Sequence, residues 1–285
     1  MNLLRLPLQI LLFFLLAQLL GLYTGSILHQ DILVNPYVQD LTVVSDGNAP
    51  ESAFLFFGYI LLGAVFIVVL IRYFFRWVWM FRLLEFMLIS TSSSLVFYAV
   101  ARLALDYTLS MGIGLLLGLL FAAIKILGAP TKNAAAILAT AGVGAVFGIS
   151  LGVIPLMIFL VLLAIYDFVA VFLTKHMVQM ARFMIQKEMA FTVTARTWLP
   201  AEKGKKPEEK RIDLGTGDLI APITMEVAVL PWGLTASLFV MLGALLSLGI
   251  FLFLVWKRKM VLPALPPIVS GTILFFFLGL AMGLY

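Results

Sequence analysis

The chain has 285 residues, of which 63% are hydrophobic and only 12% are charged, and its mean hydropathy is +1.13. Soluble globular proteins carry about 25% charged residues, so this composition excludes a water-soluble globule and indicates a polytopic membrane protein. The net charge of +5 comes from basic residues dispersed among short loops, where they set membrane orientation, so no nucleic-acid partner is expected. The chain has no cysteine, which rules out disulfides, thiol nucleophiles and thiolate metal sites.

The first apolar run extends from Leu6 to about Leu28, directly after Arg5. It is longer than the h-region of about 7 to 15 residues in a signal peptide, and no clear cleavage box follows it. We therefore expect a retained first membrane helix, with a cleaved signal peptide as the alternative.

Apolar runs long enough to cross a hydrocarbon core of about 30 Å recur along the chain between charged or Pro/Gly-bearing breaks. Residues 133–174 carry one charge and would reach about twice that thickness as a single helix, so we divide them near Gly152 and Pro155. The sequence thus predicts an all-α polytopic membrane protein with nine transmembrane helices, near residues 6–28, 53–71, 83–101, 108–127, 133–151, 154–174, 213–231, 234–255 and 262–284.

The basic residues predict how these helices are oriented. If successive loops lie on alternate sides of the membrane, every lysine and arginine except Arg102 falls on one side. The positive-inside rule then makes the N-terminus cytoplasmic and the C-terminus external. We expect one integrated membrane domain composed of helices one to six (1–174), a partly mobile cytoplasmic loop (175–212) and helices seven to nine (213–285).

Small residues recur at four-residue spacing within several predicted spans. Such ladders let helices approach closely in lipid. They predict packing seams, without a functional claim, at Gly114/Gly118, Gly144/Gly148/Gly152 and Gly279/Gly283.

Two aspartates lie at membrane depth. Asp167 is eight residues before Lys175 and Asp218 is seven residues after Arg211, which places both about 10 to 12 Å inside the cytoplasmic boundary. An ionised carboxylate at mid-bilayer costs at least about 2.5 to 3.5 kcal/mol, so a pair of them indicates function. Since spans six and seven are antiparallel, the acids can meet. Two carboxylates about 3 Å apart share one proton, which is the acid and base combination of an aspartic protease.

Two backbone features lie at the same depth. Gly215-Thr216-Gly217 precedes Asp218, and glycine permits close approach and non-helical dihedrals. Pro222 cannot donate to the carbonyl of Asp218, so a kink is expected there. Residues 263–267 contain three prolines in five positions, which predicts an extended segment rather than an ordinary helix start. Each feature alone is weak, because glycine and proline are common in membrane helices.

The three elements together resemble a known family. Tyr166-Asp167, Gly215 to Asp218 and Pro263-Ala264-Leu265 are similar to the YD, GxGD and PAL motifs of presenilin and signal peptide peptidase intramembrane aspartyl proteases. The resemblance spans the whole chain, and the short cytoplasmic loop resembles a compact prokaryotic or archaeal homologue of presenilin. It implies a multi-pass protein of a prokaryotic or archaeal cell membrane. One departure is Thr216, where the family usually has leucine.

The resemblance also implies an activity. It indicates an aspartic endopeptidase, independent of metal and cofactors, in which Asp167 and Asp218 activate a water that attacks the scissile carbonyl. Its substrates would be single-span membrane proteins or signal-peptide-like segments in the lipid bilayer, and a homo-oligomer is left open. Tyr166 points about 100° from Asp167 on a helix, so a packing role is its alternative. The residues implied to bind substrate or shape the site are Tyr166, Gly215, Thr216, Gly217, Pro263, Ala264 and Leu265.

A substrate helix must unwind before hydrolysis, and its exposed backbone then needs partners. The proline segment at 263–267 could offer some of these partners. Residues 191–198 alternate apolar and polar like a strand, and 211–214 precede the GxGD motif, so the loop is a second candidate to hold the substrate by strand addition. Residues 204–210 between them are expected to be mobile, and 177–186 to continue span six along the interface.

Three further charged residues lie within the spans and receive no catalytic part. Glu226 is expected about 12 Å beyond Asp218, as a structural group or near the external surface. Glu85 and Lys125 lie near cytoplasmic helix ends, where both can snorkel to the interface.

A proton-coupled transporter or cation leak channel is the alternative function, since it would also use intramembrane acids, broken helices and a water-filled cavity. The inverted repeat usual in transporters is not apparent here. Prepilin peptidases also carry a GxGD acid, but that resemblance does not extend to the PAL motif. A zinc protease is disfavoured because HExxH is absent and neither His29 nor His176 lies at a convincing mid-span depth.

Overall fold

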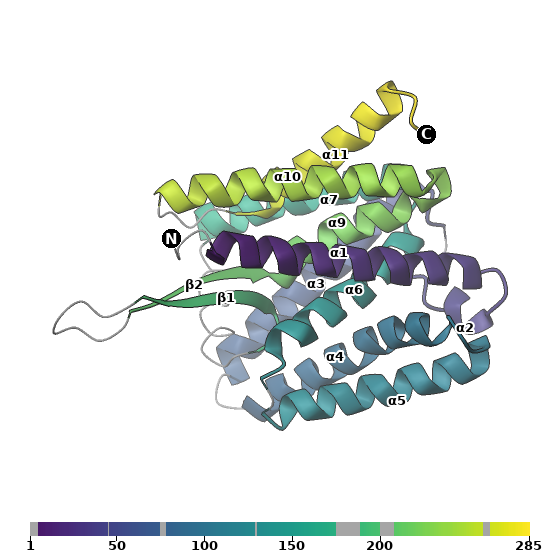
Figure 1. The fold of residues 1–285 in the computed structure, drawn as a ribbon, viewed down its shortest axis with the longest axis horizontal. Helices are drawn as coiled ribbons and strands as arrows, with labels where there is room; N and C mark the ends of the chain where they lie inside the picture. Colours follow the sequence, from purple (N-terminus) through teal and green to yellow (C-terminus); the bar gives the residue numbers. More distant parts are fainter. Residues whose placement is uncertain are drawn as a thin grey trace.

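The structure is a computed structural model, and it describes residues 5–44, 46–74, 78–128, 130–174, 189–199, 208–258 and 263–285. It is a bundle of helices with one two-stranded sheet at one end (Figure 1). The elements in chain order are α1 (Arg5–Asp31), α2 (Pro36–Gln39), α3 (Pro50–Phe74), α4 (Val78–Ala101), α5 (Tyr107–Ile126), α6 (Lys132–Ser150), α7 (Val153–Val169), η1 (Ala170–Thr174), β1 (Thr192–Leu199), β2 (Glu208–Gly215), α9 (Thr216–Ala228), η2 (Leu230–Trp232), α10 (Leu234–Arg258) and α11 (Leu265–Ala281).

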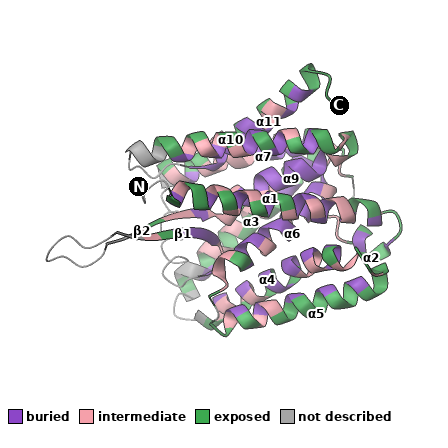
Figure 2. Cartoon of the chain, viewed as in Figure 1, coloured by how far each residue is buried: buried purple, intermediate pink, exposed green. Residues whose placement is uncertain are grey.

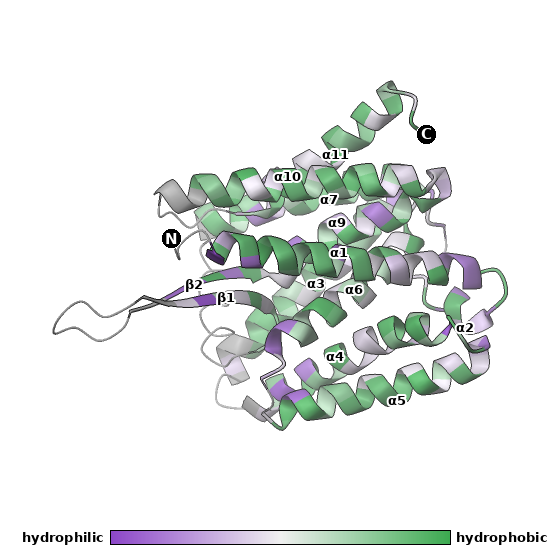
Figure 3. Ribbon diagram, viewed as in Figure 1, coloured by the Kyte–Doolittle hydropathy of each residue, from purple (hydrophilic) through white to green (hydrophobic). Residues whose placement is uncertain are grey.

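The all-α class is confirmed. Within the described ranges, seven helices are long and apolar enough to cross a membrane, and the 17-residue α11 is a shorter apolar helix. Their hydrophobic surfaces run along most of each helix, while hydrophilic residues gather toward the helix ends and on the hairpin (Figure 3). Each predicted span contains a helix, but α9 has only 13 residues, so the number of crossings and the orientation stay predictions.

Helix α9 lies at the centre of the bundle. Every residue from Ala221 to Ala228 is buried, in contrast to the exposed outer face of α5 (Figure 2). Helices α1 and α6 pack closely against it at glycine positions where a side chain would not fit. A Cβ on Gly21 of α1 or Gly144 of α6 would come within 2.5 Å of the Ile223 side chain. Gly25 and Gly148 meet Val227 in the same way, so the ladder at Gly144 and Gly148 is a close seam.

Strands β1 and β2 form an antiparallel hairpin in which Thr192 pairs with Gly215 and Leu199 with Glu208. The strand predicted over 191–198 is therefore confirmed, and 211–214 belong to its partner. Residues 208–210 are strand as well, which corrects the expectation that 204–210 are mobile, while 204–207 and 177–186 lie outside the described residues. The hairpin is fixed to α6 through the side-chain amide of Asn133. Its Nδ2 donates to the Thr194 carbonyl at 2.8 Å, and its Oδ1 accepts the Thr194 N–H at 3.0 Å.

Two helix starts differ from the predictions. Span seven was expected from residue 213, but β2 continues to Gly215 and α9 begins at Thr216, since Gly215 has extended dihedrals of φ −65° and ψ 147°. The proline-rich segment was expected to be extended. That prediction is wrong for most of it, because α11 begins at Leu265 with proline in its first turn. Proline fits there because first-turn N–H groups have no intrahelical acceptor.

Buried ion pairs join helices at both ends of the bundle. Asp31 of α1 is 2% exposed and accepts hydrogen bonds from Arg102 Nε and Nη2, both at 2.8 Å. The hydrogen bond to Asp31 raises the pKa of the Arg102 guanidinium above its usual value. At the opposite end, Glu85 of α4 pairs with Lys125 of α5, and these residues are 1% and 4% exposed. Both were expected to snorkel, and the structure instead encloses them between helices.

Candidate active site

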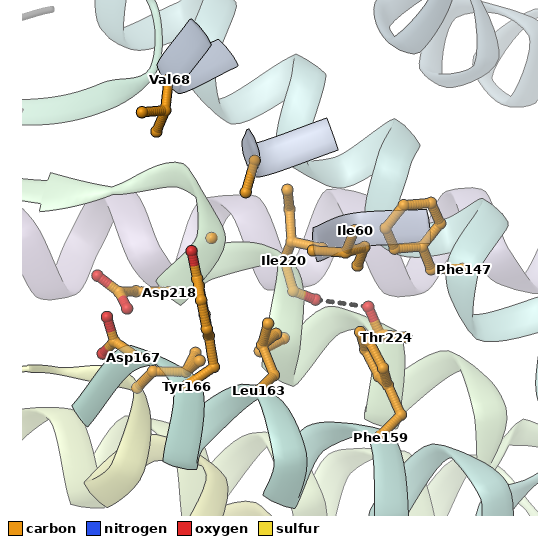
Figure 4. Close-up of a pocket in the computed structure, with 14 residues that line it drawn as sticks. Ile60, Val68, Phe147, Phe159, Leu163, Tyr166, Asp167, Asp218, Ile220 and Thr224 are labelled. Atoms are coloured by element: carbon orange, nitrogen blue, oxygen red, sulfur yellow. Dashed lines mark hydrogen bonds between the residues drawn. The ribbon is translucent and has the colours of Figure 1, made fainter. Parts of the chain in front are cut away.

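The two intramembrane aspartates lie on neighbouring helices. Asp167 is in the last turn of α7, just before the chain continues as the π-helical turn η1, and Asp218 is in the first turn of α9. In the close-up their carboxyl groups point toward one another (Figure 4). Both side chains are half-buried, so they are enclosed by the bundle and still border open space. The structure thus brings together two acids that are far apart in the sequence.

The acids lie beside a cavity of about 270 Å³. Its walls come from α3, α6, α7, α9 and the start of α11, and apart from the acids and Tyr166 they are almost entirely apolar. Within the described part of the chain, the lining residues are Ile60, Ala64, Val68, Phe147, Phe159, Leu163, Tyr166, Asp167, Gly217, Asp218, Ile220, Ala221, Thr224 and Leu265. Sequence patterns pointed to Tyr166, Asp167, Gly217, Asp218 and Leu265, but gave no signal for the other walls.

Backbone geometry fixes the position of Asp218. The Gly215 N–H interacts electrostatically with its carboxylate. The carboxylate is so close to this backbone that a Cβ on Gly215 would lie 3.2 Å from Asp218 Oδ2. Glycine at 215 therefore permits the extended strand end to approach the acid.

Asp167 is held by the start of α11. The Leu265 N–H interacts electrostatically with its carboxylate, and Leu265 itself is 5% exposed. An N–H in the first turn of a helix is free to serve a carboxylate, and the prolines that follow leave it as a defined donor. Pro263 and Ala264 are buried behind Leu265 and do not line the cavity.

Tyr166 lines the same cavity as the acids, and its part in the site stays a prediction, with packing as the alternative. Its ring lies edge to face with Phe57 of α3, with ring centroids 6.4 Å apart and an interplanar angle of 80°. In Figure 4 the Tyr166 side chain stands beside the two carboxyl groups, between them and the apolar part of the cavity.

Thr216 does not line this cavity but clamps the hairpin to the start of α9. Its N–H and its Oγ1 both donate to the Phe191 carbonyl, at 3.1 Å and 3.2 Å. The residue borders a second cavity of about 220 Å³, which shares Phe147 and Ile220 with the first. The one departure from the usual motif therefore makes a defined pair of hydrogen bonds.

Glu226 lies further along α9, away from the cavity. It is fully buried and faces Gln18 of α1, although the two side chains do not reach hydrogen-bond geometry. It is therefore a structural feature of the α1 and α9 interface rather than a group near the external surface. Among the described residues, no three His, Asp or Glu side chains stand close enough to hold a metal ion.

Comparisons with known proteins agree with this geometry. Residues 14–284 match the family described as signal-peptide peptidase and presenilin aspartyl protease. A presenilin-family intramembrane aspartate protease solved in space group C222 has the same fold, with a TM-score of 0.65 and 23% identity over 97% of this chain and 99% of that chain. A presenilin-family intramembrane aspartate protease solved in space group P2 gives a TM-score of 0.62 and 27% identity over 93% of this chain and 96% of that chain. No curated protein sequence matches. The chain belongs to the signal-peptide peptidase and presenilin family of intramembrane aspartyl proteases.

Proposed function

We propose that this protein hydrolyses peptide bonds within transmembrane helical substrates, using Asp167 and Asp218 as a catalytic dyad around an activated water and no metal. The observation that carries this proposal is the meeting of the two carboxyl groups at one end of an enclosed cavity (Figure 4). Its substrates are single-span membrane proteins or signal-peptide-like segments that reach the cavity from the lipid bilayer.

The chemistry follows from two close carboxyl groups that share one proton. The ionised member takes a proton from the water as it attacks, while the protonated member donates a hydrogen bond to the scissile carbonyl. The tetrahedral intermediate then collapses as the leaving nitrogen receives a proton from the dyad. The Gly215 and Leu265 N–H groups each interact with one carboxylate, which supports fixed positions for the two acids during the reaction.

The other predicted site residues surround this dyad. Tyr166, Gly217 and Leu265 border the space that the scissile bond would occupy. Gly215 and Thr216 fix the approach to Asp218, and Pro263 and Ala264 support the turn that presents the Leu265 N–H. Together they position the reacting groups within a mostly apolar pocket.

The hairpin offers a way to hold an unwound substrate. Asn133 occupies both the N–H and the carbonyl of Thr194, so the outer edge of β1 is already paired at that residue. In the antiparallel register Thr194 lies opposite Asp213, so the Asp213 backbone groups point away from β1. An extended substrate strand would therefore pair with the outer edge of β2, which leads directly to Gly215 and Asp218.

The test is cleavage of a helical model substrate by the purified protein in detergent or vesicles. Asp167→Ala, Asp218→Ala and the double variant should each lose activity by about 10²- to 10⁴-fold or more, as expected when a general acid or base is removed. Asp40→Ala, which changes an exposed acid after α2, is the matched control and should cleave like the wild type. Persistent cleavage in the double variant would reject the dyad. Ion flux that requires both acids, without any cleavage, would instead favour the transport alternative.

A further inference from the structure

The buried ion pair between Glu85 and Lys125 lies outside the catalytic cavity. It joins α4 to α5 at the end of the bundle that carries the hairpin (Figure 1). Enclosing two charges in a low-dielectric interior carries a desolvation cost of several kcal/mol per ion, which their attraction only partly offsets. A buried pair of this kind therefore contributes little to stability. The other contacts of Glu85 indicate a different role for the pair.

Glu85 also binds the segment that leads into β1. Its Oε1 accepts the Ala190 N–H at 2.6 Å as well as the Lys125 ammonium. Met189 and Ala190 are buried, at 3% and 4% exposure. Arg82 of the same helix lies 3.9 Å from the other carboxylate oxygen. Glu85 thus fixes one peptide group at the base of the hairpin.

The residue after Ala190 is hydrogen-bonded to the start of α9, which carries Asp218. Phe191, the next residue, offers its carbonyl to both the N–H and the Oγ1 of Thr216. Thr216 is the first residue of α9, two residues before Asp218, and glycines flank it on both sides. Because glycine restricts the backbone little, the position of this junction between β2 and α9 depends on hydrogen bonds from neighbouring segments.

We infer that Glu85 is a positioning residue for Asp218, acting through Ala190, Phe191 and Thr216, with Lys125 holding its carboxylate in place. This inference rests on the proposed function, since it assigns the pair to the alignment of that dyad. Displacement of a reacting group by about 1 Å can reduce a rate by 10²-fold, so a small shift of the Phe191 carbonyl would be felt in catalysis.

The experiment replaces the whole pair, so that no unpaired charge is left in the interior. Glu85→Leu/Lys125→Met removes the acceptor for the Ala190 N–H, whereas Glu85→Gln/Lys125→Met keeps a side-chain oxygen there. We expect kcat to fall at least tenfold in the leucine variant with little change in KM, and to be largely restored in the glutamine variant. Asp31→Leu/Arg102→Met is the matched control. It removes an ion pair at the far end of the bundle, between the buried Asp31 and the partly exposed Arg102, and should lower Tm while kcat stays within about twofold of wild type.

A second readout does not depend on cleavage. Hydrogen exchange of peptides covering 213–219 should be faster in the leucine variant than in the glutamine variant or the Asp31 control. If the wild-type protein cleaves no substrate, the proposed function fails. The exchange rates still decide whether Glu85 and Lys125 fix the backbone of residues 213–219. Equal exchange in the three variants, or a loss of kcat that the glutamine variant does not restore, would overturn the inference.

A single substitution at Thr216 is a milder test if the doubly substituted proteins fold poorly. Thr216→Val keeps the shape and the N–H but removes the Oγ1 donor to Phe191. It should lower kcat several-fold and speed exchange over 213–219, whereas Thr216→Ser, which keeps the hydroxyl donor, should lose less kcat and show slower exchange than the valine variant. A valine variant with wild-type kcat and exchange would contradict the proposed link.

Discussion

Helices α9 and α3 both line the cavity beside Asp167 and Asp218, but they are held in opposite ways. The 13-residue α9 is clasped by glycines of α1 and α6 and is also packed against α10 and α11. The 25-residue α3 packs mainly on α7 within the described structure, and Leu62 on its outer face is 68% exposed. One wall of the site is therefore fixed by close packing, while the other has few neighbours to hold it.

This difference in packing meets two separate requirements of the site, precise placement of Asp218 and room for a bulky substrate. Asp218 lies on the fixed wall, where small errors in position would be most damaging to catalysis. Ile60, Ala64 and Val68 lie on the loosely held wall, which can adjust to a bulky substrate. Asp167 stands between them, since α7 contacts α3 on one side and α9 and α11 on the other.

The strongest test of this comparison concerns how firmly Asp167 is held. Leu265→Pro removes the N–H that interacts with its carboxylate, and a hydrogen bond to a charged group, if the two form one during the reaction, contributes about 1.5 to 3 kcal/mol. If that energy is lost in the transition state, kcat should fall about 10- to 100-fold. Leu265→Ala keeps the N–H and should mainly lower stability and raise KM, as measured by thermal unfolding and steady-state cleavage. Equal kcat in both variants would show that α7 alone holds Asp167.

Adding a single Cβ atom at Gly148 of α6 tests how tightly α9 is packed. A Cβ on Gly148 would lie 2.5 Å from Val227 Cβ and 2.8 Å from the Thr224 carbonyl, so Gly148→Ala should destabilise the protein by about 1 to 3 kcal/mol. Gly63→Ala on α3 meets nothing within 4 Å and should leave stability unchanged or raise it by up to about 1 kcal/mol. Denaturation in mild detergent measures both, and a similar loss in the two variants would contradict the contrast.

The loosely held wall can be tested by filling the cavity. Ala64→Phe places a ring among the lining residues, and we expect KM to rise by about tenfold, equivalent to about 1.4 kcal/mol, with a smaller change in kcat. The fold should persist because α3 has room to move outward. Leu62→Phe adds a ring on the exposed face of the same helix and should leave cleavage unchanged. A drop in Tm for Ala64→Phe as large as that for Gly148→Ala would show that α3 is also tightly held.

Sequence patterns predicted the parts of this molecule that depend on composition and periodicity. Long apolar runs located the helices, because a membrane span needs about 20 apolar residues. The matching distances of Asp167 and Asp218 from basic residues placed both acids at one depth, and the alternation over 191–198 located β1. The ladder at Gly144 and Gly148 indicated a seam, although not its partner helix.

The features that sequence patterns missed depend on contacts between distant segments. The start of α9 at Thr216 follows from pairing of β2 with β1, which local preference does not reveal. The prolines after Leu265 were taken as helix breakers, although the first turn of a helix accepts them. Glu85 and Lys125 are 40 residues apart, so the sequence gave no reason to pair them rather than send each to the interface.

The shortness of α9 bears on how the protein enters its membrane. At 1.5 Å per residue its 13 residues reach about 20 Å, less than a bilayer core, and they include two carboxylic acids. The insertion machinery, which selects segments by apolar length, would not admit such a segment by itself. Helices α1 and α6 are synthesised earlier, so their glycine faces are already in the bilayer when α9 emerges. The order of translation therefore provides this catalytic helix with a protein surface to insert against.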